Sequence, residues 1–211
     1  MGERLLLVDS DVFIILSAAG YLERAICLLG FRFEAARRLP ALTSQLTRGA
    51  AFRDRYPDAV RHEALKCCGM VASLTERPDD SSVLDSLALV SDIDEGEAVM
   101  YALLKEQPSW LLVSGDKRAM CALAATPELS AVHNALTGRI ICLEALIRKL
   151  VERDGIQPVA KAFAPLGAIS KTLSVVFSKG ETTSLADCMK ALDDYLRDLT
   201  KQVGAGFLLT P

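Results

Sequence analysis

The 211-residue chain lacks any apolar run close to the roughly 20 residues that a membrane-spanning helix requires. Its longest apolar runs cover residues 5–8 and 12–19, and the acids Asp9 and Asp11 interrupt them. It also lacks the basic segment followed by an apolar segment that is typical of a secretory signal. We therefore expect a cytoplasmic protein with no membrane partner.

Ligands for soft metals are also scarce. The two histidines, His62 and His133, are isolated from each other, and no cysteine pair has the spacing of a zinc site. We expect most of the six cysteines to be small buried side chains in a reducing compartment. Any metal would then have oxygen ligands. The cysteines are Cys27, Cys67, Cys68, Cys121, Cys142 and Cys188.

A strong positive charge is absent as well. The chain has 24 lysines and arginines against 27 acids, a formal net charge of -3. This excludes a generally basic surface that coats nucleic acid, although a local basic patch remains compatible with it. No internal repeat or low-complexity tract occurs. With 51% hydrophobic residues, the chain is long enough to bury a core.

Short apolar runs alternate with longer amphipathic segments in the first two thirds of the chain. This alternation predicts βαβ crossovers and a parallel sheet between two helical layers, a three-layer α/β/α fold. We predict strands at residues 5–8, 31–33, 83–90, 110–113 and 139–143. The predicted helices cover residues 13–29, most of 34–76 with breaks near Gly49, Pro57 and Gly69, then 98–105 and a segment ending near 125.

Beyond residue 143 the pattern is helical only. We predict helices at residues 144–152, 158–163, 169–177 and 185–203, the last with Ser184 as its N-cap. Residues 1–155 would form the main domain. Residues 156–211 would form a helical extension packed on that core.

Three acids follow or adjoin predicted strand ends: Asp9, Glu97 and Asp116. In open parallel sheets the ligand site lies outside the carboxyl ends of the strands, so we expect these acids to converge. Carboxylates in one cleft repel each other, and a hard cation such as Mg²⁺ or Mn²⁺ relieves the repulsion. Such an ion also activates water against a phosphodiester. The pattern therefore favours hydrolytic nuclease chemistry.

Each of these residues also has a purely structural interpretation. Asp9 or Asp11 would serve as a turn or N-cap residue, and Asp116 as the N-cap of the next helix. The segment from Asp94 to Glu97 matches a capping box. The arginines between residues 37 and 61 would form a solvated helix face instead of an RNA-binding patch.

Taken in order, the segments resemble the PIN-domain family of metal-dependent ribonucleases over about residues 3–150. Asp9-Ser10-Asp11 after the first strand resembles the opening signature of that family, Gly96-Glu97-Ala98 its central acid, and Ser114-Gly115-Asp116 its third motif. The resemblance implies an endoribonuclease, as in toxin–antitoxin pairs, that uses Mg²⁺ or Mn²⁺. It further implies RNA as substrate, an antitoxin protein as partner and a homodimer.

The resemblance also assigns roles to individual residues. Asp9, Glu97 and Asp116 would be the catalytic metal ligands. A further acid usual in the family has only Glu34 and Asp94 as candidates here. The supporting residues would be Asp11, Asp94, Ser114 and Glu34, and the weaker RNA contacts Arg37, Arg38, Lys117 and Arg118.

Two alternatives stay open. The first is a non-catalytic PIN-fold module that binds RNA or a protein partner, which metal-dependent cleavage would distinguish. The second is a phosphatase of the haloacid dehalogenase type, because Asp9-Ser10-Asp11 also resembles its nucleophile motif. The segment after Gly115-Asp116 does not continue as that family expects. Phosphatase activity on a small substrate would favour the second alternative.

Overall fold

The computed structural model describes residues 4–211, and a four-stranded, all-parallel sheet lies at its centre. The strand order is β2-β1-β3-β4. The strands are β1 (Leu6–Val8), β2 (Ala36–Arg38), β3 (Leu111–Ser114) and β4 (Ile140–Cys142). Every residue of β1 and β4 is buried, as expected for strands covered on both faces. The prediction of an α/β chain with a parallel sheet is confirmed.

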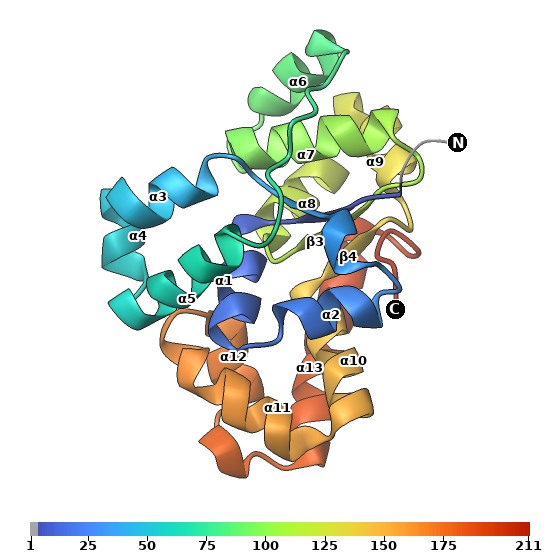
Figure 1. Cartoon of the computed structure of the whole chain (residues 1–211). Helices are drawn as coiled ribbons and strands as arrows, with labels where there is room; N and C mark the ends of the chain where they lie inside the picture. Colours follow the sequence, from blue (N-terminus) through green and yellow to red (C-terminus); the bar gives the residue numbers. More distant parts are fainter. Residues whose placement is uncertain (1–3) are drawn as a thin grey trace.

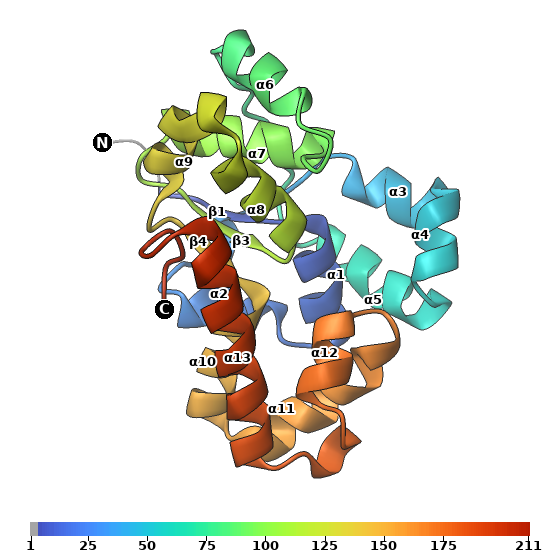
Figure 2. The same cartoon turned by 180° about the vertical axis from the view of Figure 1, so that it is seen from behind.

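Helices lie on both sides of this sheet. In both views, α7 (Glu95–Glu106) and α9 (Ser130–Leu136) lie on one side, whereas α2 (Leu22–Leu28) and α10 (Leu143–Asp154) lie on the other (Figures 1 and 2). None of the helices in residues 4–211 is both long and apolar enough to cross a membrane.

Extended segments of the same chain cover both outer strands. Beside β2, the amide of Arg38 donates to the carbonyl of Ala72, and the amide of Leu74 donates to the carbonyl of Arg38. Beside β4, the amide of Leu209 donates to the carbonyl of Ile140 at 2.8 Å. Each contact satisfies backbone groups that an exposed sheet edge would offer to another chain.

The predicted strand at residues 83–90 is wrong, because this segment forms α6 (Ser81–Ala88). Asp80 caps the helix by accepting hydrogen bonds from the amides of Ser82 and Val83. Val83 and Leu87 are four positions apart and therefore share one side of the helix, and the helix packs against α7. The spacing of the apolar residues therefore fits a helix, and the N-cap residue Asp80 favours a helix over a strand.

Two other boundaries differ from the prediction. The second strand lies at Ala36–Arg38 and not at residues 31–33. It contains two arginines, so a search for apolar runs does not find it. The single helix predicted at residues 13–29 is two helices, α1 (Ser10–Ala18) and α2. Between them the chain turns at Gly20, whose φ of 69° is costly for other residues.

The remaining helices follow the predicted breaks. The first group is α3 (Leu42–Arg48), α4 (Ala50–Arg55) and α5 (Asp58–Cys68), followed after β3 by α8 (Lys117–Ala125). The last part holds α11 (Ile156–Phe163), α12 (Lys171–Val176) and α13 (Leu185–Val203). Ser184 accepts a hydrogen bond from the amide of Asp187, so its N-cap role is confirmed. Helix α13 packs against α8 and α10.

Three of the six cysteines are buried, fewer than the majority that the sequence predicted. Cys68, Cys142 and Cys188 are buried, whereas Cys27 is exposed and the other two are half-buried. All six are free thiols.

Arg38 offers a test of the fold. Its side chain is buried and donates to the carbonyl of Cys68 at 3.0 Å, joining β2 to the end of α5. We expect Arg38→Ala to lower the free energy of unfolding by about 1–3 kcal/mol, because it leaves that buried carbonyl unpaired. Urea unfolding measures the change. Arg53→Ala, at an exposed position of α4, is the control, and equal stability of the two variants would contradict the structural role.

Candidate active site

The strand order places a switch point between β1 and β3. The chain leaves β1 toward β2 on one side and later returns to β3 on the other side, so the connections diverge above this pair. The amide of Asp9 donates to the carbonyl of Val113 at 3.0 Å, directly across the two strands. Asp116 follows β3 by two residues. The expected convergence of Asp9 and Asp116 at one edge of the sheet is therefore observed.

A cleft of about 1370 Å³ opens at this switch point. The first predicted acid, Asp9, lines it together with Glu97 from the first turn of α7 and Asp116 from the start of α8. Further polar lining comes from neighbouring helices and loops, and its residues include Asp11, Asp94, Arg55, Arg77, Lys117, Arg118 and Lys171.

Asp9 occupies the N-cap position of α1, but its side chain makes no capping hydrogen bond. Instead, its carboxylate interacts with the backbone amides of Gly115 and Ser10. The side chain is therefore turned toward the end of β3. This arrangement does not support the interpretation of Asp9 as a simple N-cap.

Glu97 forms the capping box that the sequence suggested. Its Oε2 accepts from the amide of Asp94 at 2.9 Å, and Oδ1 of Asp94 accepts from the amide of Glu97 at 2.8 Å. This exchange holds both carboxylates at the N-terminus of α7. It uses one oxygen of each, so capping leaves the other oxygen available to a ligand.

Asp116 is also a genuine N-cap. Its Oδ1 accepts from the amide of Ala119 at 3.0 Å, and its Oδ2 lies 3.5 Å from the exposed guanidinium of Arg118. The hydroxyl of buried Ser114 accepts from the amide of Asp116 at 3.2 Å. Ser114 thus fixes the turn that places Asp116 in the cleft, which agrees with its prediction as a supporting residue.

Two carboxyl groups of the cleft have raised pKa values, because they are buried and lie near other acids. Burial, followed by the charge of Asp11, raises the pKa of Asp9 to about 7. Burial raises the pKa of Glu97 to about 8, and the charges of Asp116, Asp94 and Asp9 add to this rise. Asp9, Asp94 and Asp116 therefore lie within electrostatic reach of Glu97.

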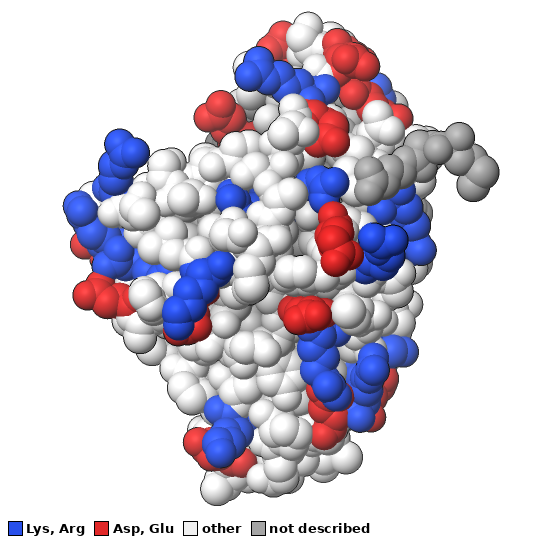
Figure 3. All heavy atoms as spheres, in the orientation of Figure 1, with Lys and Arg blue, Asp and Glu red and all other residues white. Residues whose placement is uncertain are grey.

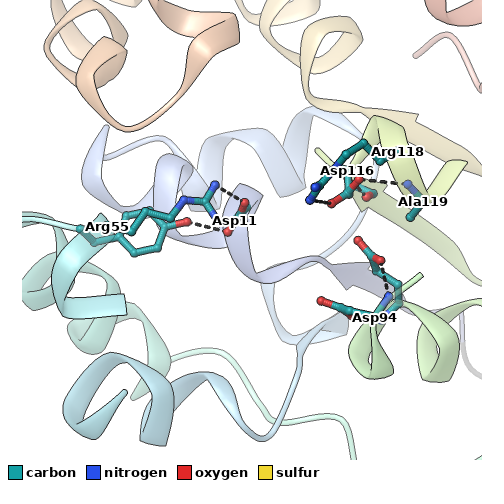
Figure 4. A network of polar contacts seen from close by, with 9 residues as sticks. Asp11, Arg55, Asp94, Asp116, Arg118 and Ala119 are labelled. Carbon is teal, nitrogen blue, oxygen red and sulfur yellow. Dashed lines mark hydrogen bonds and ion pairs between the residues drawn. The ribbon is translucent and has the colours of Figure 1, made fainter. Parts of the chain in front are cut away.

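Asp11 was predicted to support the three metal ligands, but its carboxylate is bound to other residues. Its carboxylate accepts from Arg55 and from the hydroxyl of buried Tyr56, both at 2.5 Å. Figure 4 shows Asp11 turned toward Arg55, whereas Asp94 and Asp116 lie together on the other side of the site. Asp11 therefore anchors α4 and the start of α5 beside the cleft. Burial and this carboxylate raise the pKa of Tyr56.

Three predicted residues lie elsewhere. Glu34 precedes β2, at the opposite end of the strands from the cleft, and its exposed side chain lies 3.5 Å from Arg32. Arg37 donates to the carbonyls of Glu34 and Ala36, and Arg38 is buried. None of the three lines the cleft. Glu34 therefore does not supply the further acid, and Arg38 is a structural residue.

Sequence reasoning missed one residue near the acids and two residues that line the cleft. Tyr101, one turn after Glu97, is fully buried, and its hydroxyl has no hydrogen-bond partner within residues 4–211. Its pKa is raised by burial and then by the charge of Glu97. Its i+4 spacing from Glu97 was the available signal. Lys171 and Tyr195 also line the cleft, but nothing in their local sequence relates them to it.

The donors suit a hard cation in their chemistry, because all are carboxylate oxygens. Within residues 4–211, however, no three histidine, cysteine or acidic side chains are grouped closely enough to hold a metal ion as they stand. The capping bonds of Glu97 and Asp116 hold these side chains on their own helices. A cation would therefore be held by the carboxylate oxygens that these capping bonds leave free.

The raised pKa values predict how stability depends on pH. Asp9 and Glu97 have ordinary pKa values of 3.8 and 4.5, so these two groups hold more protons in the folded chain than in the unfolded chain up to about pH 8. The free energy of unfolding should then fall as the pH rises through this window. Without divalent ions, we expect Glu97→Gln to match the wild type near pH 5 and to exceed its stability near pH 8.5.

The side-chain oxygen of glutamine can still accept the hydrogen bond from the amide of Asp94, so the capping box survives this substitution. Urea unfolding at the two pH values measures the effect. Glu128→Gln, at an exposed position outside the cleft, should leave the pH profile unchanged. A parallel pH profile for Glu97→Gln and the wild type would show that Glu97 ionises normally.

Comparison with protein-family models, curated proteins and solved structures finds no match to this chain, so its geometry carries the functional conclusion.

Proposed function

We propose that this chain is a Mg²⁺- or Mn²⁺-dependent ribonuclease with the three-layer arrangement of the PIN domains that its motifs resemble. One observation carries the proposal. Three acids from distant segments, Asp9, Glu97 and Asp116, line a single cleft at the switch point of a parallel sheet. Sites of this kind bind ligands at that place in many open α/β sheets.

The chemistry follows from the residues that line the cleft. Asp9, Glu97 and Asp116 would hold the cation through carboxylate oxygens. A bound cation would lower the pKa of its water and neutralise charge on the leaving oxygen of a phosphodiester. Ser114 and Asp94 position two of the acids through backbone hydrogen bonds. Basic side chains at the rim would attract the phosphates of RNA.

A non-catalytic binding module of the same fold is the second candidate. It is favoured by the absence, within residues 4–211, of three acids already grouped for a metal. A phosphatase that uses Asp11 as its acid is disfavoured. The Arg55 and Tyr56 contacts hold the carboxylate of Asp11 away from a proton-transfer role.

The ribonuclease proposal predicts metal-dependent cleavage. The purified protein should cut single-stranded RNA in MnCl₂ or MgCl₂ and should not cut it in EDTA. Asp116→Asn should lower the cleavage rate by roughly 100-fold or more, because it removes a ligand charge. Asparagine caps helices about as well as aspartate, so the melting temperature without metal should stay equal or rise. Asp85→Asn, on the exposed side of α6, should cleave normally.

Stability measurements test the same cation without any cleavage. At roughly 100 times its Kd, Mg²⁺ should add about 2.7 kcal/mol to the free energy of unfolding of the wild type. Asp116→Asn should gain much less. Cleavage and full Mg²⁺ stabilisation in this variant would remove Asp116 from the site. A wild type that gains no stability from either ion and cuts no RNA would leave the binding module as the function.

A further inference from the structure

The C-terminal extension forms part of the cleft. Lys171 and Thr172 of α12 and Tyr195 of α13 line the same cavity as the acids of the β1–β3 switch point. On another wall, α4 contributes Phe52 and Arg55. Both groups of helices border the ends of β1 and β3, with α12 below and α3 to α5 beside them (Figures 1 and 2). Two separate groups of helices therefore contribute to the lining of the cleft.

The cations of the cleft fall into two classes. Arg55, Lys117 and Arg118 are each paired with an acid. Arg77 and Lys171 line the cleft as exposed side chains, and no ion pair is described for either within residues 4–211. On the face drawn in Figure 3, basic and acidic side chains are intermixed and form no continuous basic patch. The two unpaired cations are thus available to an anionic ligand that enters the cleft.

Aromatic rings accompany these cations. Tyr195 and Phe52 are half-buried and line the cleft from the two walls. Nζ of Lys117 lies 3.8 Å from the centre of the Tyr195 ring, which fixes the position of that ring. Proteins that bind single-stranded nucleic acid combine cations, which contact the phosphates, with aromatic rings on which bases stack. Lys171 and Tyr195 place one group of each kind at the border of the acidic centre of this cleft.

We propose that α12 and α13 form the wall that holds a single-stranded RNA over the acids, with Lys171 contacting a phosphate and Tyr195 stacking on a base. This inference rests on the proposed function, since it uses the same cleft. Asp9 and Glu97 are only 8% and 5% exposed, so a phosphate reaches them only by entering between the walls. A duplex keeps its bases stacked on one another and offers none to Tyr195.

Binding in EDTA tests the proposal without requiring cleavage. The probe is a fluorescein-labelled oligouridine, and fluorescence anisotropy gives its affinity over a range of salt concentrations. Lys171→Ala should weaken binding roughly threefold to tenfold and reduce the slope of log K against log salt by about 0.7, the loss of one phosphate contact. Lys161→Ala is the matched control, because Lys161 is an exposed lysine of the same extension outside the cleft.

Tyr195→Leu should weaken binding about fivefold or more and leave the salt slope unchanged, because stacking involves no phosphate. Tyr195→Phe keeps the ring and should bind like the wild type. If Tyr195→Leu unfolds, Tyr195→Trp replaces it and should bind at least as tightly as the wild type. Because Lys171 is exposed, we expect Lys171→Ala to fold normally, so its binding measurement does not depend on the Tyr195 variants.

The outcomes separate this inference from the proposed function. Normal binding by both Lys171→Ala and Tyr195→Leu would overturn the inference even if the wild type cuts RNA. Equal affinity of the wild type for duplex and single-stranded RNA, or no binding at all, would also overturn it. A wild type that binds oligouridine through Lys171 and Tyr195 but cuts no RNA with Mn²⁺ would refute the nuclease function and leave the binding wall established.

Discussion

The parallel pairing of β1 with β3 is the constraint on which the site depends. Because Leu6 to Val8 lie in register with Leu111 to Val113, the two strands end within one residue of each other. The acids that follow them are then forced into one crevice. Helix α7 adds Glu97 from above the sheet, and burial of two of these carboxylates opposes their ionisation. The fold therefore carries an electrostatic cost at this edge.

Local structure and site chemistry share the same carboxylates. Glu97 and Asp116 each satisfy an amide at the start of a helix, and that bond fixes the direction of the side chain. A helix N-terminus also favours negative charge, so each cap partly offsets the repulsion between the acids. A capping role and a ligand role are compatible because a carboxylate has two oxygens. The structural interpretation of these motifs is therefore correct for Glu97 and Asp116 and does not exclude the functional one.

The sequence predicted the parts of the fold that depend on local pattern. The strands near residues 5–8, 110–113 and 139–143 were recognisable because burial on both faces demands continuous apolar runs. The strand at Ala36–Arg38 was not, since its pairing with β1 and with residues 72–74 stabilises it despite two arginines. Asp9 and Asp116 were found from strand-end positions. Glu97 lines the same cleft, but the strand from which its position was predicted is helix α6. The partners of Asp11 lie more than 40 positions away and depend on tertiary packing that no local pattern reports.

The buried carboxylate of Glu144 connects the C-terminal extension to the cleft. Oε1 of Glu144, in α10, accepts from Lys117 at 2.7 Å and from the hydroxyl of Thr172 at 2.9 Å. Glu144 is 2% exposed, so losing either partner would leave a buried carboxylate poorly compensated. Lys117 directly follows Asp116, and Thr172 belongs to α12. The contact that neutralises Glu144 thus also fixes α12 against the first turn of α8, which bears Asp116. Together with the packing of α13 on α8 and α10, this interaction links the position of the extension to the start of α8.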